Sequence, residues 1–311
     1  MVYTVLRGVY PVFQTPFAAD ESIDFSGLER EIDWIASQGP HGVVFGMVSE
    51  SLRLQDSERR QIIRIASSAA AARGLPCVAS VGGESTAIAR SRIDDAISAG
   101  ASALMATPPL HGKNSPGQLE EYFRVLLKHS SVPVIIQDAS GYVGQSLTVE
   151  MQARLFEEFG PHVKFKPEAV PVRPTLDALL AATGGKAEIF EGMGGAALLE
   201  TYPGGVSGSM PGAEVCWAVV AMWNALESGD IERARSINTP LSEMISMQDD
   251  LDSFVVCEKF LLVEQGVITS ETARTPLGFS LDPEGRARLV RLLAELRETV
   301  GTLAPVETER A

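Results

Sequence analysis

The sequence is poor in the residues on which several kinds of site depend. Its only cysteines, Cys77, Cys216 and Cys257, stand singly among apolar neighbours without CxxC spacing, which argues against a disulfide scaffold or a thiolate metal site. We expect them to be reduced core residues. None of the four histidines stands at metal-ligand spacing from another, which disfavours a zinc-dependent class II aldolase. The run 192–195 is no GxGxxG fingerprint, so we predict neither a metal nor a dinucleotide cofactor.

Positive charge and long apolar runs are also scarce. The 26 basic residues face 40 acidic ones, which gives a formal charge of -14. The attraction to phosphate is therefore missing overall, and we expect neither nucleic acid nor an anionic membrane as a partner. The apolar run around Trp217 to Trp223 is far shorter than the roughly 20 residues of a membrane span, and residues 1–8 lack a signal-peptide core. We predict a cytoplasmic protein.

What the sequence does contain is a regular alternation of two patterns. Short runs rich in Val, Ile and Phe alternate with longer helical patterns, as in parallel βα units. We expect eight strands, at residues 8–13, 42–46, 76–81, 103–107, 133–138, 163–166, 187–191 and 205–209. Eight units in about 220 residues fit a (β/α)8 TIM barrel better than a doubly wound sheet.

The strand pattern stops after Ser228. Three helices are expected beyond it, at 231–247, 253–265 and 283–300, with Asp230 and Asp282 placed as N-terminal caps. We therefore predict a catalytic barrel over residues 1–228, a C-terminal three-helix domain over 229–303 and a flexible tail over 304–311.

Two lysines mark the predicted sixth strand. The chain has six lysines against twenty arginines, and Lys164 and Lys166 stand at alternate positions of that strand, so both should face the barrel interior. Burial and a nearby positive charge lower the pKa of a lysine and make its amine nucleophilic. Active sites of such barrels form at the carboxyl ends of the strands, so Lys166 is a candidate for Schiff-base chemistry. The alternative is that Lys166 pairs with a carboxylate such as Glu168 and only holds the barrel together. Lys164 lies deeper, and we expect it to be structural.

Other polar positions on the same rim are less specific. The turn that begins at Gly46 and includes Ser49 could present backbone N–H groups to a small carboxylate, or could be no more than a tight turn. His111 follows two prolines after the fourth strand and is either a rim acid or base or a surface residue. Gln137 and Asp138 point in opposite directions, so one should face the pocket while the other supports a loop.

Together these segments resemble the family of dihydrodipicolinate synthases and N-acetylneuraminate lyases, the pyruvate-type class I aldolases. The matching motifs are Gly8 with residues 15–17, the turn 46–51, the run 81–86, the two prolines 108–109, and Lys166. The resemblance implies a Schiff base between Lys166 and the keto group of a 2-oxo acid, without a further cofactor. It also implies that the backbone amides of Met47 and Val48 hold the acid's carboxylate and that the protein is a homo-oligomer, either a tetramer or a dimer. We add Gly208 to the expected substrate-binding residues.

Departures from the family pattern narrow the predicted function. Gln137 stands where the synthase and the lyase carry a proton-shuttling tyrosine. Met47 and Val48 replace two hydroxyl residues, and Tyr142 replaces the arginine that binds the synthase's second substrate. Dihydrodipicolinate synthase activity is therefore an alternative rather than the main prediction.

The runs 49–50, 109–112, 137–139 and 166–168 look closer to the L-2-keto-3-deoxyarabonate dehydratases. In that branch the glutamate two residues past the lysine, here Glu168, is a candidate acid or base, and strand alternation places it near the rim with Lys166.

The resulting prediction is a lyase of carbohydrate acid metabolism that dehydrates a 2-keto-3-deoxy sugar acid. Lys166 attacks the C2 ketone, Glu168 or a water held by Ser49 or His111 moves the C3 proton, and the C4 hydroxyl leaves as water. Two alternatives stay open: retro-aldol cleavage to pyruvate and an aldehyde by the same lysine, and a barrel that only binds a 2-oxo acid. The region 192–197 does not align cleanly with that branch, which leaves the substrate open.

Overall fold

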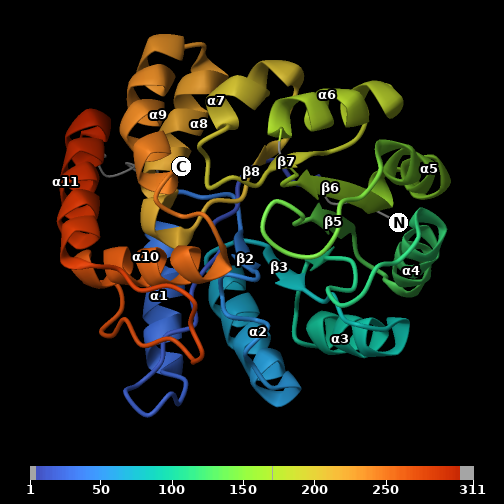
Figure 1. Ribbon diagram of the computed structural model, residues 1–311, viewed down its shortest axis with the longest axis horizontal. Helices are drawn as coiled ribbons and strands as arrows, with labels where there is room; N and C mark the ends of the chain where they lie inside the picture. Colours follow the sequence, from blue (N-terminus) through green and yellow to red (C-terminus); the bar gives the residue numbers. More distant parts are fainter. Residues whose placement is uncertain (1–4, 170, 302–311) are drawn as a thin grey trace, which may run out of the picture.

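The computed structural model describes residues 5–169 and 171–301 and has the predicted (β/α)8 barrel, with strands at the centre and helices around them (Figure 1). Five neighbouring strands form one parallel sheet: β2 (Val43–Phe45), β3 (Cys77–Ser80), β4 (Ala103–Ala106), β5 (Val134–Asp138) and β6 (Val163–Pro167). Three shorter strands form a second parallel sheet in the order β1, β8, β7: β1 (Gly8–Val9), β8 (Gly208–Ser209) and β7 (Phe190–Glu191).

Single backbone bridges close the two sheets into a ring. Val12, after β1, bridges Val44 of β2, and Phe165 of β6 bridges Ile189 just before β7. The first, seventh and eighth strands are shorter than the predicted spans 8–13, 187–191 and 205–209. In the first case Pro11 has no N–H group with which to continue the ladder, although its carbonyl accepts from Val44 N at 2.8 Å.

Within residues 5–169 and 171–301, eight helices follow the strands in order and cover the outside of the ring. They are α1 (Phe25–Ser37), α2 (Asp56–Ala71), α3 (Thr86–Ser98), α4 (Pro116–His129), α5 (Val149–Phe159), α6 (Val172–Ala182), the short α7 (Leu198–Thr201) and α8 (Cys216–Ser228). The apolar run around Trp217 and Trp223 is α8, which is buried on nearly every side because it packs against both β1 and the C-terminal helices. The three cysteines are free and buried, as predicted.

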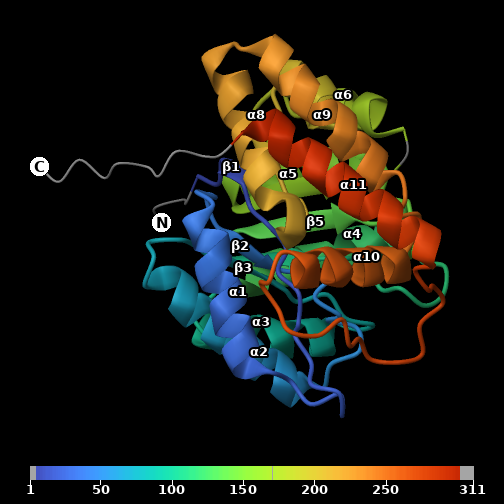
Figure 2. The same ribbon diagram turned by 90° about the vertical axis from the view of Figure 1, so that its left-hand side faces the viewer.

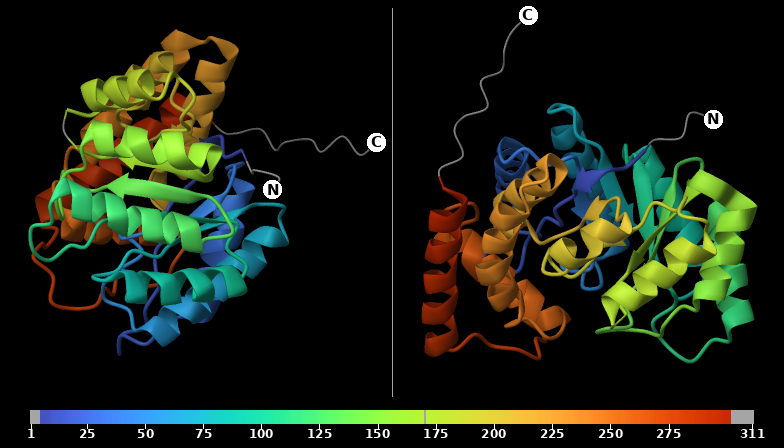
Figure 3. Two further views of the ribbon diagram at one scale, coloured as in Figure 1. Left: turned by 90° about the vertical axis from the view of Figure 1, so that its right-hand side faces the viewer. Right: turned by 90° about the horizontal axis from the view of Figure 1, so that it is seen from above.

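The C-terminal extension consists of α9 (Ile231–Ile245), α10 (Leu251–Glu264) and α11 (Pro283–Val300). Asp230 and Asp282 cap α9 and α11 as predicted, whereas α10 begins two residues earlier than predicted because Asp250 caps it. The extension lies on one side of the barrel (Figure 2), opposite α4 and α5 across the strands (Figure 3). The predicted tail 304–311 lies outside the described residues. Over the described ranges, no helix has both the length and the apolar character that crossing a membrane requires.

Candidate active site

A pocket with about 440 Å³ of empty space, part of it open to solvent, lies at the carboxyl ends of the strands. The strands and the turns that follow them supply most of its lining, and α10 supplies the rest. The lining residues are Val12, Gly46, Met47, Val48, Met105, Gln137, Tyr142, Lys166, Glu168, Gly192, Gly194, Met210, Gly212, Phe254 and Glu258.

The centre of this pocket is a lysine and a carboxylate at the end of β6. Lys166 Nζ lies 2.8 Å from Glu168 Oε1, and both side chains are almost entirely buried. Gln137 Nε2 donates to the other carboxylate oxygen at 2.6 Å, and the Tyr142 hydroxyl donates to Oε1. Glu168 therefore accepts three hydrogen bonds from side chains that all line the pocket, so its position relative to the amine is fixed.

The structure settles which way the last two residues of β5 point. Gln137 faces the pocket, whereas Asp138 accepts hydrogen bonds from Ser140 N at 3.0 Å and Leu147 N at 2.8 Å. Asp138 thus holds the loop after β5, and this loop carries Tyr142 over Glu168. From the sequence, Tyr142 stands out only as the residue that replaces the family arginine. The structure shows that its side chain lines the pocket.

The turn after β2 contributes backbone rather than side-chain groups. Met47 and Val48 line the pocket, and neither N–H group donates to another atom of the described part of the chain. Ser49, in contrast, lies outside the pocket lining, because its hydroxyl donates to Phe13 O at 2.5 Å and accepts from Gly46 N at 3.0 Å. The turn uses Ser49 to hold its own shape, and the expected contact of Ser49 with the substrate stays a prediction.

His111 and Gly208 also lie outside the pocket lining, and their expected substrate-binding role stays a prediction. The His111 side chain is 90% exposed, and its Nδ1 lies 3.3 Å from Glu84 Oε2 on the outer rim. Gly208 lies inside β8, where a Cβ atom would come within 1.9 Å of the Gly8 carbonyl oxygen. Its lack of a side chain serves the close pairing of β8 with β1.

Lys164 occupies the deeper position that strand alternation predicts. Its ammonium group lies 2.5 Å from Glu188 Oε2, and Glu188 also accepts from Leu6 N at 3.0 Å. Burial lowers the pKa of Lys164 although Glu188 opposes the shift. This lysine therefore has its own carboxylate partner and does not line the pocket of Lys166.

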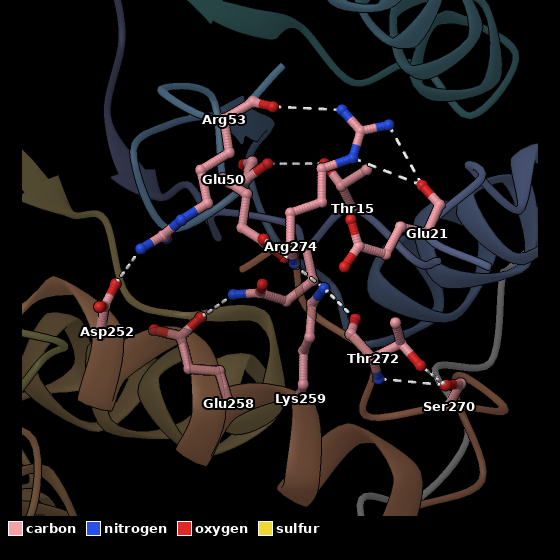
Figure 4. A network of polar contacts seen from close by, with 12 residues as sticks. Thr15, Glu21, Glu50, Arg53, Asp252, Glu258, Lys259, Ser270, Thr272 and Arg274 are labelled. Atoms are coloured by element: carbon pink, nitrogen blue, oxygen red, sulfur yellow. Dashed lines mark hydrogen bonds and ion pairs between the residues drawn. The ribbon is translucent and has the colours of Figure 1, made fainter. Parts of the chain in front are cut away.

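The C-terminal extension completes the pocket, which sequence reasoning missed. Phe254 and Glu258 stand four residues apart on α10, and both line the pocket. The next residue, Lys259, bonds Glu50 at the end of the 46–50 turn and donates to Thr272 O at 2.7 Å (Figure 4). The same helix therefore supplies pocket side chains and fixes the turn that carries Met47 and Val48.

Glycines keep the space beside the reactive groups open. A Cβ atom on Gly192, directly after β7, would lie 2.5 Å from Glu168 Cγ and 2.8 Å from Lys166 Cε. On Gly212 it would lie 2.2 Å from Glu214 Oε2 and 2.7 Å from Glu258 Oε1. The described residues contain no group of three His, Cys, Asp or Glu side chains that could hold a metal ion.

Fold and site together define a class of protein. Strand ends of a (β/α)8 barrel are where its enzymes carry their catalytic groups, and a buried lysine beside a carboxylate is the constellation of covalent imine catalysis. Of the buried lysine–glutamate pairs in the described residues, the pair of Lys166 is the one whose lysine lines this pocket. The molecule has the architecture of a class I, Schiff-base-forming lyase.

Comparison with known proteins gives the family. The profile of the Dihydrodipicolinate synthetase family matches residues 5–296, and the chain belongs to this family of Schiff-base lyases. It is 27% identical over 295 residues to the L-2-keto-3-deoxyarabonate dehydratase of Azospirillum brasilense, covering 93% of this chain and 94% of that protein. It is 25% identical to the 4-hydroxy-tetrahydrodipicolinate synthase of Methanothrix thermoacetophila, covering 96% and 100%. A crystal structure of a putative dihydrodipicolinate synthetase from Pseudomonas aeruginosa superposes with a TM-score of 0.87 at 25% identity, covering 94% and 100%.

Proposed function

We propose that this lyase dehydrates a 2-keto-3-deoxy sugar acid through an imine on Lys166. The observation that carries the proposal is the Lys166 amine 2.8 Å from the Glu168 carboxylate, in a pocket that also offers the free amides of Met47 and Val48. The likeness to an L-2-keto-3-deoxyarabonate dehydratase over 93% of the chain supports this substrate class.

The carboxylate of the substrate binds the Met47 and Val48 amides, which places the C2 ketone at the Lys166 amine. Attack by the amine and loss of water give an iminium ion, which withdraws electrons and acidifies the C3 protons. Glu168 takes a C3 proton, and the C4–O bond breaks with loss of water. Tyr142, whose phenol contacts the same carboxylate oxygen as Lys166, carries protons during imine formation in place of the absent family tyrosine.

Product analysis tests this proposal. A 2-keto-3-deoxy pentonate should yield a 2,5-dioxo acid and no pyruvate, whereas pyruvate plus an aldehyde would establish retro-aldol cleavage instead. Lys166→Ala should abolish turnover, and Lys186→Ala, which removes an exposed lysine outside the pocket, should leave it unchanged. Condensation of pyruvate with aspartate semialdehyde, without dehydration of sugar acids, would favour synthase activity. Absence of turnover on every 2-keto-3-deoxy acid would favour a barrel that only binds 2-oxo acids.

Three further statements stay predictions. A homotetramer or homodimer is expected from the family resemblance, and sedimentation equilibrium measures the state directly. A cytoplasmic location and the absence of nucleic-acid and membrane partners rest on the net charge of -14 and the lack of long apolar runs.

A further inference from the structure

We propose that Glu258 is a second catalytic residue of this enzyme, the acid that protonates the C4 hydroxyl as it leaves. The inference rests on the proposed dehydration, and it assigns separate carboxyl groups to the two proton transfers at C3 and C4. Glu258 lies on α10, in the C-terminal extension, whereas Lys166 and Glu168 lie at the end of β6 in the barrel.

The position of Glu258 carries the proposal. Its side chain is 2% exposed and lines the same pocket as Lys166 and Glu168. Gln14 Nε2 donates to Glu258 Oε2 at 2.5 Å, which holds the carboxyl group. In Figure 1, α10 and β6 are well separated elements, and Glu258 and Glu168 therefore come to the pocket lining from different parts of the fold.

The surroundings of Glu258 differ from those of Glu168 in the way that two proton-transfer roles require. Glu168 accepts hydrogen bonds from three side chains, those of Lys166, Gln137 and Tyr142. Within the described residues, Glu258 accepts one amide hydrogen bond, from Gln14, and has buried acidic neighbours. Two carboxyl groups held in such different surroundings can divide the proton transfers, one as base and one as acid.

The groups that face Glu258 favour its protonated form. Burial, followed by the nearby Glu214, raises the pKa of Glu258 well above the usual carboxyl range, and Glu31 adds to the shift, while Gln14 and the Lys166 cation oppose it. Burial also raises the pKa of Glu214 to about 7 and that of Glu31 to about 8. Burial and the acidic neighbours therefore favour the neutral form of Glu258, beside a pocket that contains an amine nucleophile.

The proton balance closes over one turnover. Glu168 takes a C3 proton, the resulting enamine expels the C4 hydroxyl, and Glu258 supplies the proton with which that hydroxyl leaves as water. The ionised Glu258 then takes a proton from C5, while Glu168 returns its proton to C3. Hydrolysis of the iminium releases the enol of a 2,5-dioxo acid. Both carboxyl groups regain their starting states, and the net reaction is the loss of one water without an oxidant or reductant.

Glu258→Gln isolates the proton-donor function, because glutamine keeps the shape and can still accept from Gln14. Two substrates are compared: a 2-keto-3-deoxy pentonate, whose hydroxide leaving group needs a proton, and a 4-chloro-2-oxo acid, whose chloride does not. The variant should lose about 100-fold or more in water elimination while chloride elimination stays within about threefold of the unmodified enzyme. Glu264→Gln, which removes an exposed charge from the same helix, should change neither rate.

The outcomes separate this inference from the proposed function. Equal loss of both eliminations in Glu258→Gln would make the residue structural, and unchanged water elimination would also overturn the proposal. An unmodified enzyme that expels chloride but not water would contradict it as well, because a proton donated by Glu258 should let the C4 hydroxyl leave as water. Failure of pyruvate to form an imine on Lys166, in contrast, would refute the proposed function itself.

Discussion

Gly192 lies so close to Lys166 that a Cβ atom at position 192 would come within 2.8 Å of Lys166 Cε. The same atom would lie 2.5 Å from Glu168 Cγ. The residue directly after the seventh strand thus leaves room for the amine and the carboxylate at the end of the sixth. Gly192 does not have a positive φ angle, so its backbone conformation does not require glycine. The requirement comes instead from the side chains of Lys166 and Glu168, which leave no space for a Cβ atom.

Gly192→Ala should therefore slow imine formation roughly 100-fold, since a displacement of about 1 Å at a reacting group has that effect. The measurement is the rate at which pyruvate and borohydride inactivate the protein. Gly117→Ala, in α4 with no atom within 4 Å of the added Cβ, is the matched control and should react normally. Normal imine formation in the Gly192 variant would show that Lys166 does not need this geometry.

Glu168→Gln should separate imine formation from proton transfer. The variant keeps hydrogen-bonding atoms at the site, so pyruvate should still be trapped on Lys166, but exchange of the pyruvate methyl protons in D₂O should fall about 100-fold or more. The control variant is Glu188→Gln, which removes the carboxylate partner of Lys164 and should leave the exchange of the pyruvate methyl protons unchanged. If Glu168 were only the ion partner of Lys166, its variant would lose stability and keep normal exchange.

Tyr142→Phe removes the phenol that donates to Glu168 while it leaves the ring in place. Burial, together with the nearby Glu168, raises the pKa of Tyr142 well above its usual value, so the hydroxyl keeps its proton at neutral pH and remains a donor. We expect roughly 100-fold slower imine formation, measured by pre-steady-state trapping. Tyr122→Phe should lose only stability, because its hydroxyl bonds Gly83 N and O outside the pocket. If Tyr142→Phe and Tyr122→Phe form the imine at the same rate, Tyr142 does not take part in imine formation.

The buried acids predict a dependence of stability on pH. Burial raises the pKa of Glu31 to about 8 from 4.5. Because this value is raised in the folded state, the contribution to stability is complete below the unfolded value and is lost as the pH rises towards 8. For this group the free energy of unfolding should fall by up to about 1 kcal/mol per pH unit between roughly pH 5 and 8.

Urea unfolding at several pH values measures this dependence. Glu31→Gln keeps an acceptor for Gln14 N, which donates to Glu31 Oε1 at 2.8 Å, and should flatten the slope. Glu29→Gln, an exposed position on the same helix, should leave the slope as it is. An unchanged slope in the Glu31 variant would mean that this carboxyl group is ionised in the folded protein.

The sequence was most informative where a property is local to one element. Alternation along β6 predicted that Lys164 and Lys166 share the barrel interior and that Glu168 stands at the same rim as Lys166, and the structure has all three there. The barrel and the three C-terminal helices were likewise readable from the order of strand and helix patterns. Asp230 and Asp282 marked two helix starts because capping is local.

The sequence was least informative where the site depends on distant segments. Glu258 stands 92 positions beyond Lys166 and reaches the pocket only because α10 docks on the barrel, and no local pattern encodes that docking. Ser49 lies outside the pocket lining for a different reason. The turn has Glu50 at a φ of 57°, and Ser49 directs its hydroxyl to Phe13 O and Gly46 N rather than into the pocket.

The most direct test of the central claim is reductive trapping with pyruvate and borohydride, followed by peptide mass mapping of the modified lysine. We predict one stable adduct, on Lys166, and no adduct in Lys166→Ala. The absence of any adduct, or an adduct on Lys164, would contradict the assignment of Lys166 as the Schiff-base nucleophile.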